Sequence, residues 1–211
     1  MKTILVTGGA GFIGSHTCIY LIENGYEICV LDSLSHSDIR SLSKIKQIFS
    51  GKNINLNDKL NFFKGDLRNK EFIDSVFKKS KNQSKPINGV IHFAGVKSIA
   101  ESVLNPMKYW ENNLIGSYNL IKTMSENNCT TIVFSSSATV YGNTTDALIK
   151  ESSKIKPINP YGSTKYAVEN LLNDVFSAKK NKWRVAILRY FNPIGAHPSG
   201  LIGENPLEKP S

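Results

Sequence analysis

Short runs of apolar residues alternate along the chain with longer segments in which apolar residues recur at a helical period. The short runs are nearly continuous in Val, Ile, Leu and Phe. Runs of this kind are typical of strands buried on both faces of a parallel sheet. We therefore predict strands at Thr3–Thr7, Glu27–Leu31, Leu60–Lys64, Gly89–His92, Thr131–Ser135 and Arg184–Arg189.

The segments with a helical period lie between these strands, at Phe12–Asn24, Ser37–Phe49, Lys70–Ser80, Pro106–Asn127 and Tyr161–Lys179. Alternation of strands and helices is typical of a sheet wound by right-handed crossovers, with helices on both faces. We predict an α/β fold, a doubly wound, Rossmann-like parallel sheet in three α/β/α layers. Residues 192–211 are rich in Pro and Gly and lack a period, so we expect one domain over 1–191 and the start of a second lobe over 192–211.

A glycine-rich turn, TGGAGFIGSH, separates the first predicted strand from the first predicted helix. It fits Gly9-x-Gly11-x-x-Gly14 and equally Gly8-x-x-Gly11-x-x-Gly14. Glycine permits positive φ and lets the backbone approach a diphosphate at the helix N-terminus. Asp32 ends the second predicted strand, where a carboxylate accepts hydrogen bonds from both ribose hydroxyls and repels a 2′-phosphate. The pattern therefore predicts a dinucleotide site that favours NAD over NADP.

Two Tyr-x-x-x-Lys pairs occur on predicted helices, Tyr161 with Lys165 and Tyr118 with Lys122. Residues four apart share a helix face, and Lys165 lies in line with an apolar stripe, where an ammonium group is costly. Ligands of doubly wound sheets bind beyond the carboxyl ends of the strands. Tyr161 begins its helix next to that edge, whereas Tyr118 lies mid-helix. We therefore predict that Tyr161 is catalytic and that Tyr118 is a packing residue.

Ser137 follows the fifth predicted strand, in the stretch FSSSATVYG, and completes a Ser–Tyr–Lys set. A phenol ionises near about pH 10 in water, and a neighbouring cation stabilises the phenolate, so we expect Lys165 to lower the pKa of Tyr161. Ser137 would hydrogen-bond the reacting hydroxyl and relay its proton. The set predicts proton removal from an alcohol while a hydride leaves its carbon for NAD.

Six stretches together resemble the UDP-glucose 4-epimerases of the extended short-chain dehydrogenase/reductase superfamily. They cover essentially the whole chain and are TGGAGFIG, Asp66-Leu67, HFAGVKSIAESVLNP, SSSATVYG, PYGSTKY and LRYFNPIGAHPSG. The resemblance implies an isomerase of galactose metabolism that interconverts UDP-glucose and UDP-galactose. It also implies the route, in which C4 of the sugar is oxidised to a ketone and the hydride returns to the other face, with NAD bound throughout.

The same resemblance implies roles for individual residues. Ser137 and Tyr161 are implied to be catalytic, and Lys165 to hold both Tyr161 and the nicotinamide ribose. Asn192 and Lys97 are implied to reach the nucleotide-sugar, with Ser137 and Tyr161. Together with the turn glycines Gly8, Gly11 and Gly14, the expected NAD contacts are Phe12, Ile13, Asp32, Asp66, Leu67, Phe93, Ala94, Gly95, Lys97, Asn112, Ser135, Tyr161, Lys165 and Phe191.

Dehydratases and decarboxylating enzymes related to this family carry carboxylates just after the position of Ser137, where this chain has Ala138 and Thr139. A simple 4-epimerase therefore fits best. Epimerisation of another nucleotide-sugar, such as an N-acetylated or uronic one, is the enzymatic alternative. The family continues with a C-terminal lobe that clamps the nucleotide, whereas this chain ends at Ser211, and this difference favours a third reading, a catalytically silent NAD-binding protein. Without that lobe, we expect the strand Arg184–Arg189 to leave a sheet edge unprotected.

Composition narrows the set of partners. A net charge of +9 comes mostly from scattered lysines without interleaved aromatics, so nucleic-acid binding is not expected. No apolar run approaches the roughly 18 residues that cross a bilayer, so no membrane association is expected. Three cysteines without a C-x-x-C pair indicate a reducing, cytoplasmic location with no disulfide framework, and no metal site is predicted. The family resemblance implies a homodimer.

Overall fold

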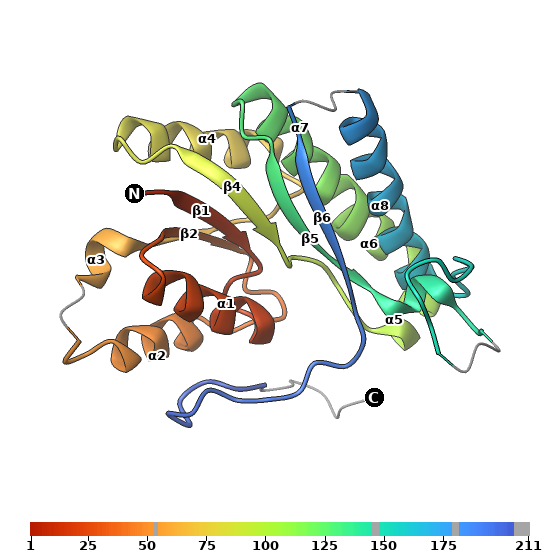
Figure 1. The fold of residues 1–211 in the computed structure, drawn as a ribbon, viewed down its shortest axis with the longest axis horizontal. Helices are drawn as coiled ribbons and strands as arrows, with labels where there is room; N and C mark the ends of the chain where they lie inside the picture. The colour runs from red at the N-terminus through yellow and green to blue at the C-terminus, as the bar shows by residue number, and fades with distance from the viewer. Residues whose placement is uncertain (53–54, 145–147, 179–181, 205–211) are drawn as a thin grey trace. The chain divides into compact units, whose positions relative to one another are not determined.

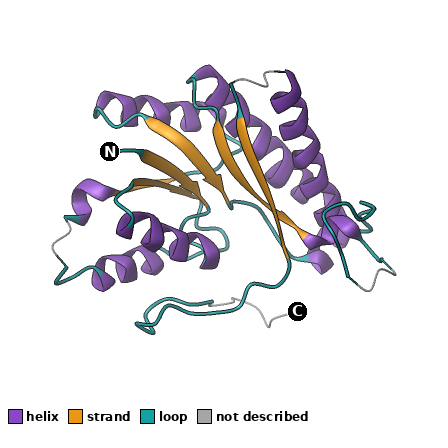
Figure 2. Cartoon of the chain, in the orientation of Figure 1, coloured by secondary structure: helices purple, strands orange, loops and turns teal. Residues whose placement is uncertain are grey.

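The computed structural model describes residues 1–52, 55–144, 148–178 and 182–204. Within this part of the chain the strands form a six-stranded parallel sheet in the order β3-β2-β1-β4-β5-β6, with helices flanking it. This order and the helices between the strands confirm the predicted Rossmann-like α/β fold (Figures 1 and 2). The strands are β1 (Thr3–Thr7), β2 (Glu27–Asp32), β3 (Leu60–Lys64), β4 (Ile87–His92), β5 (Thr131–Ser137) and β6 (Arg184–Tyr190).

The helices agree with the predicted ones except in the middle of the chain, where one predicted helix is divided into three parts. Two short helices, α3 and α5, and the 3₁₀ turn η2 were not predicted. The helical elements are α1 (Phe12–Glu23), α2 (Arg40–Ile48), α3 (Leu56–Lys59), α4 (Lys70–Asn82), α5 (Ile99–Leu104), α6 (Pro106–Tyr109), the π-helix η1 (Trp110–Ile115), α7 (Gly116–Glu126), η2 (Ala138–Tyr141) and α8 (Pro160–Ala178).

The described chain divides into two compact units. Unit 1 holds residues 1–66, 74–94 and the described residues from 194 onward, and unit 2 holds residues 67–73 and 95–193. The predicted domain boundary between residues 191 and 192 is not tested by this division and stays a prediction. No helix of the described residues is long and apolar enough to cross a membrane.

In unit 1, β1 pairs in parallel with β2 on one side and β4 on the other. Alternate strand residues face opposite sides of the sheet. Val30 of β2 belongs to the apolar cluster formed with α1 and α2, whereas the neighbouring Cys29 lies 3.9 Å from the Ser80 hydroxyl of α4. Helices therefore cover both faces, as the continuous apolar strands predicted. Ile202, near the end of the described chain, also packs into the α1–α2 cluster.

In unit 2, β5 and β6 pair in parallel, and α8 packs on both strands (Figure 1). Val168 and Leu172 of α8 are fully buried, as predicted for its apolar stripe, but Phe176 is exposed because it lies in the last turn of the helix. Residues along β6 alternate between exposed and half-buried, and Leu188 is 41% exposed. One face of β6 is therefore open to solvent in the described chain.

Candidate functional site

The glycine turn of unit 1 follows β1 and leads into α1. Gly8 has φ +69°, donates its N–H to the Leu31 carbonyl at 2.9 Å and accepts a hydrogen bond from the Gly11 N–H at 3.1 Å. A Cβ atom at Gly8 would lie 2.7 Å from the backbone nitrogen of Ala94. Both the backbone conformation and the close approach of the β4 end therefore require glycine at this position.

The turn also fixes the start of α1. A Cβ atom at Gly14 would lie 2.3 Å from the Gly8 carbonyl oxygen, so only glycine lets the helix pack directly on the turn. Gly11 is the N-cap residue and supplies no side-chain cap to the first N–H groups of the helix. Uncapped N–H groups at a helix N-terminus form a binding site for an anionic group. The first turn of α1, at Phe12 and Ile13, thus fits the diphosphate of a dinucleotide.

Asp32 lies at the carboxyl end of β2, and only 6% of it is exposed. One carboxylate oxygen accepts the Ala10 N–H at 3.0 Å, and the other accepts the Leu34 N–H at 2.9 Å and the Ser37 hydroxyl at 2.7 Å. The Ser41 hydroxyl holds the opposite side of Ala10 by donating to its carbonyl at 2.8 Å. The carboxylate predicted to bind ribose therefore also orders the glycine turn, a role that the sequence did not reveal.

Unit 2 brings together the predicted Ser–Tyr–Lys set. Lys165, on α8, is 5% exposed and donates from Nζ to the Ser135 carbonyl oxygen at 2.9 Å. Its Nζ lies 5.0 Å from the centre of the Phe134 ring and 5.9 Å from that of the Tyr161 ring. Burial lowers the pKa of Lys165 to about 8, because an ammonium group is poorly solvated there. The amine thus ionises close to neutral pH.

Tyr161, in the first turn of α8, is surrounded by other polar and aromatic side chains. Burial raises its pKa, and a hydrogen bond with the Ser137 side chain lowers it by less. The pKa of Tyr161 is raised overall because burial is the larger influence. This is opposite to the lowering that we expected from Lys165. The Tyr109 ring contacts the Tyr161 ring edge-on, with 6.4 Å between the ring centres. The Tyr109 hydroxyl donates to the Glu101 carboxylate at 3.0 Å.

Ser137 ends β5 and caps the 3₁₀ turn η2. Its hydroxyl oxygen accepts the Thr139 N–H at 3.2 Å and the Thr139 hydroxyl at 2.9 Å. A Cβ atom at Gly162 would lie 2.8 Å from the Thr139 carbonyl oxygen, so glycine is needed where α8 begins against this turn. The residue after Tyr161 therefore permits the close approach of Tyr161 to Ser137.

Asn113, which the sequence did not single out, is 3% exposed. Its amide oxygen accepts the Val96 N–H at 2.9 Å, and its amide nitrogen donates to the Val96 carbonyl and to the Thr164 hydroxyl. It thereby ties the loop after β4 to α8, next to Lys165. The predicted NAD ligand Asn112 instead donates to the Lys108 carbonyl at 2.8 Å. Its assignment to NAD stays a prediction.

A buried ion pair continues the same face of α8. Glu169, 1% exposed, accepts three hydrogen bonds from the Arg189 guanidinium of β6, at 3.0, 3.3 and 2.7 Å, and one from the Ser136 hydroxyl at 2.5 Å. Arg189 also donates to the Tyr141 hydroxyl at 2.8 Å. The network joins β5, β6, η2 and α8, the elements that carry Ser137 and Lys165. In the sequence, the only sign of this ion pair is Glu169, a charged residue within the apolar stripe of the helix.

The remaining predicted ligands lie at the ends of strands and in the loops that follow them. In unit 1 the Phe93 N–H donates to the Thr7 carbonyl at 3.0 Å and the Ala94 N–H to the Thr7 hydroxyl at 3.4 Å. In unit 2, Leu67 is buried, whereas Lys97 is exposed. The other assignments to NAD or sugar also stay predictions, for Asp66 in unit 1 and for Gly95, Phe191 and Asn192 in unit 2.

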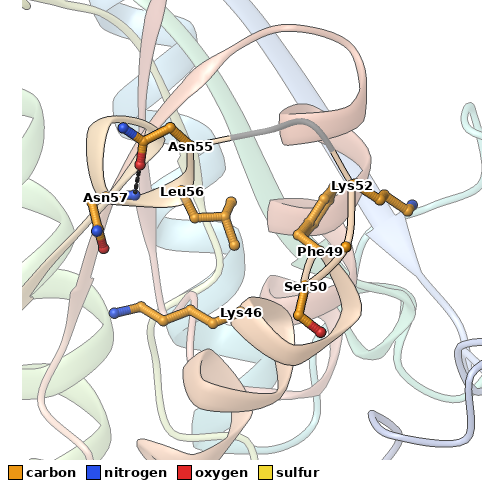
Figure 3. Close-up of a pocket in the computed structure, with 8 residues that line it drawn as sticks. Lys46, Phe49, Ser50, Lys52, Asn55, Leu56 and Asn57 are labelled. Carbon is orange, nitrogen blue, oxygen red and sulfur yellow. Dashed lines mark hydrogen bonds between the residues drawn. The ribbon is translucent and has the colours of Figure 1, made fainter.

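A pocket of about 290 Å³ opens in unit 1 near the end of α2 and α3 (Figure 3). None of the predicted site residues lines it, so it is separate from the candidate site. Among the described residues no group of three or more His, Cys, Asp or Glu side chains is placed to hold a metal ion. The pocket is lined by Lys46, Phe49, Ser50, Gly51, Lys52, Asn55, Leu56 and Asn57.

Comparison with known proteins finds epimerases by family model and by sequence. A family model described as "NAD dependent epimerase/dehydratase family" matches residues 4–205. The UDP-glucose 4-epimerase of Bacillus subtilis is 50% identical over 203 residues, which are 96% of this chain and 56% of that protein. The bifunctional UDP-glucose 4-epimerase and UDP-xylose 4-epimerase 1 of Pisum sativum is 44% identical over 97% of this chain and 56% of its own length.

Solved structures agree with these relatives. The UDP-glucose 4-epimerase of Bifidobacterium longum, in complex with NAD⁺ and UDP, superposes with a TM-score of 0.89 at 41% identity, over 99% of this chain and 59% of that one. A UDP-glucose 4-epimerase from Stenotrophomonas maltophila, with bound NAD and formylated UDP-arabinopyranose, gives a TM-score of 0.89 at 38% identity over 100% of this chain and 59% of its own. The chain thus spans a little over half the length of the proteins that it resembles.

Proposed function

Because the chain belongs to the NAD dependent epimerase/dehydratase family, we propose that it is the NAD-binding part of an isomerase that interconverts UDP-glucose and UDP-galactose. The observation that carries this proposal is the buried ammonium group of Lys165 in the first turns of α8, beside Tyr161. An ammonium group is costly to bury unless a negative charge forms next to it. Proton abstraction by Tyr161 forms such a charge. The matched relatives, most of which carry the name UDP-glucose 4-epimerase, support the same reaction class.

The cofactor is assigned to groups that fit it chemically. The uncapped first turn of α1 suits the diphosphate, and Asp32 suits the hydroxyls of the adenine ribose. Lys165 suits the nicotinamide ribose. When bound, NAD takes a hydride from C4 of the sugar and returns it. A 2′-phosphate beside the buried carboxylate of Asp32 would be repelled, so we expect NAD and not NADP.

Tyr161 would take the proton of the C4 hydroxyl. Its phenol and the Lys165 amine each resist charge in isolation, because burial raises the pKa of the first and lowers that of the second. A phenolate and an ammonium formed together compensate each other, so the pair ionises more readily than either group alone. On reduction of the ketone, Tyr161 returns the proton to the sugar oxygen. Ser137 supplies a hydrogen bond throughout.

One other function has specific support, the epimerisation of a different nucleotide-sugar. One matched relative also acts on UDP-xylose by its name, and another is a UDP-Glc/GlcNAc 4-epimerase from Campylobacter jejuni, which favours epimerisation of a different nucleotide-sugar. The buried Lys165 beside Tyr161 disfavours a catalytically silent NAD-binding protein. A dehydratase is disfavoured, since Ala138 and Thr139 supply no carboxylate and the Thr139 hydroxyl is already bound to Ser137.

We also infer that two copies associate and that the protein works in a reducing compartment such as the cytoplasm. Ile115 and Tyr118 expose nearly half of their surface on η1 and α7, where a second copy could cover them. Sedimentation velocity on the purified chain tests the association.

The inference of a reducing compartment is supported by the cysteines. All three, Cys18, Cys29 and Cys129, are free and buried.

Calorimetry with NAD and NADP tests the cofactor assignment. The wild-type chain should bind NAD more tightly than NADP, and Asp32→Ala should weaken NAD binding by at least about tenfold, since two hydrogen bonds to the ribose are lost. Asp38→Ala is the matched control, because Asp38 is an exposed carboxylate nearby that pairs with Arg40. A chain that prefers NADP, or an Asp32→Ala variant that binds NAD normally, would refute the assignment.

A further inference from the structure

The Ser137 hydroxyl has both of its acceptor positions occupied by one residue. Thr139 donates to it twice, from the backbone N–H at 3.2 Å and from the side-chain hydroxyl at 2.9 Å. A hydroxyl oxygen has two lone pairs and a single proton. With both lone pairs engaged, Ser137 can take part in a further hydrogen bond only by donating its proton.

The surroundings determine where that proton points. Ser137 is 9% exposed, so solvent offers few acceptors. A hydrogen bond between the Ser137 and Tyr161 side chains lowers the pKa of that phenol. Because Thr139 occupies both lone pairs of the Ser137 oxygen, Ser137 is the donor in that bond. Gly162 lacks a Cβ atom, which would lie 2.8 Å from the Thr139 carbonyl oxygen, so the start of α8 can lie close to η2, with Tyr161 near this donor. Thr139 therefore controls the direction of the Ser137 hydroxyl.

We propose that Thr139 is a positioning residue that commits Ser137 to donating its hydrogen bond toward Tyr161. This inference rests on the proposed function only in taking Tyr161 as the group that exchanges a proton with the sugar. It changes the role predicted for Ser137 from proton relay to fixed donor. The proton of the sugar hydroxyl passes directly to the Tyr161 oxygen, and Ser137 keeps its own proton throughout. No other proton changes place.

Hydrogen bonds in such a chain strengthen one another, because a hydroxyl that accepts becomes a better donor. Loss of the Thr139 hydroxyl should therefore weaken the hydrogen bond that Ser137 gives to the phenolate and raise the pKa of Tyr161. Other titratable groups lie around Tyr161: Lys165 from α8, and Tyr109 from α6, whose hydroxyl donates to Glu101 from α5. A substitution at Thr139 leaves all three in place, so the change in pKa reports on Ser137.

The test uses the 211-residue chain labelled with 3-fluorotyrosine, which ionises at lower pH than tyrosine and reports each phenol by fluorine NMR. The chain has eight tyrosines, and Tyr161→Phe identifies the resonance of Tyr161. Thr139→Val and Thr139→Ala, two variants of different size, both remove the hydroxyl donor. Each should shift the midpoint of Tyr161 to higher pH, while Thr139→Ser, which keeps the donor, should titrate like the wild type.

A double-variant comparison separates positioning from general disturbance. Ser137→Ala should raise the midpoint at least as far as Thr139→Val, and adding Thr139→Val to Ser137→Ala should produce no further shift. Unchanged midpoints in both Thr139→Val and Thr139→Ala, or a full shift that persists without Ser137, would overturn the proposal. The titration requires no NAD, sugar or turnover, so a chain without epimerase activity would leave this result standing.

Discussion

Helices α7 and α8 carry the same spacing of three side chains in very different surroundings. Each has Tyr, Lys and Glu at intervals of four residues, so that the three share one face: Tyr118, Lys122 and Glu126 on α7, and Tyr161, Lys165 and Glu169 on α8. On α7 the tyrosine is 46% exposed, and the lysine is exposed. On α8 the lysine and glutamate are almost completely buried. The spacing of the three residues is the same on both helices, whereas the extent to which their side chains are buried differs.

The two glutamates show what the surroundings change. Glu126 pairs with Lys70 at 2.7 Å at the surface, where water screens the charges and the pair contributes little. Glu169 pairs with Arg189 at the same distance but is 1% exposed, and the Ser136 hydroxyl adds a further hydrogen bond. A charge that cannot be solvated must be met by a fixed partner, so Glu169 depends on Arg189 more than Glu126 depends on Lys70. The prediction that Tyr118 is a packing residue is wrong for the described chain, because its ring is half exposed.

The largest expected difference concerns turnover. Tyr161→Phe should reduce conversion of UDP-galactose to UDP-glucose by about 1,000-fold, because removal of a general base typically costs 10²–10⁴-fold. Tyr118→Phe should change it by less than about twofold. A coupled assay that detects UDP-glucose, run in the presence of NAD, measures both. Equal effects would remove the distinction between the helices, and a wild-type chain without turnover would favour the silent alternative.

The next largest difference concerns stability. Arg189→Ala leaves the Glu169 carboxylate buried without its cation, which should lower the free energy of unfolding by about 3 kcal/mol. Lys70→Ala breaks the matching surface pair of Glu126 and should lower it by less than about 1 kcal/mol. Urea denaturation followed by circular dichroism gives both values. Similar losses for the two variants would contradict the contrast drawn from burial.

For the two lysines we expect a smaller change in the free energy of unfolding, and one of opposite sign. The pKa of Lys165 falls from 10.5 to about 8 on folding, so at pH 7 the folded chain bears the full cost of its buried ammonium group. Lys165→Met should therefore stabilise the chain at pH 7 by about 2 kcal/mol, after the lost hydrogen bond to Ser135 is deducted from the cost of that shift. Lys122→Met should have little effect.

The dependence on pH provides the control for Lys165→Met. Between about pH 8 and pH 10.5 the unfolded chain binds a proton at Lys165 that the folded chain has released, so the cost of this lysine declines as pH rises. The advantage of Lys165→Met over the wild type should shrink across that range. Comparing the two proteins removes the contributions of all other groups. An advantage that stays constant with pH would mean that burial of the charge is not its origin.

Much of the fold and part of the site follow from local patterns. The six strands were predicted within two residues at either end, because continuous apolar runs bounded by polar residues identify buried strands. The glycine turn, Asp32 and the Tyr161–Lys165 pair were identified because each depends on residues close in sequence and on a known edge of the sheet. The structure places each of these groups at the expected end of its strand or helix.

Other features depend on contacts that no local pattern encodes. The single helix predicted over Pro106–Asn127 contains a π-helix at Trp110–Ile115. A π turn adds a residue and changes which side chains face inward, so a period of 3.6 cannot identify Asn113 as the buried asparagine. The double donation from Thr139 to Ser137 depends on the turn geometry after β5. The pairing of Glu169 with Arg189 joins residues 20 positions apart on different elements.

The central claim is that Lys165 is a buried amine held beside Tyr161, and its ionisation can be measured directly. Carbon-13 NMR of the chain labelled at the lysine Cε positions follows each amine with pH, and Lys165→Met identifies the resonance of Lys165. We predict a midpoint for Lys165 at about pH 8. A midpoint at the ordinary lysine value of 10.5 would show that Lys165 faces solvent, and would contradict the distinction between the two helices and the function proposed from it.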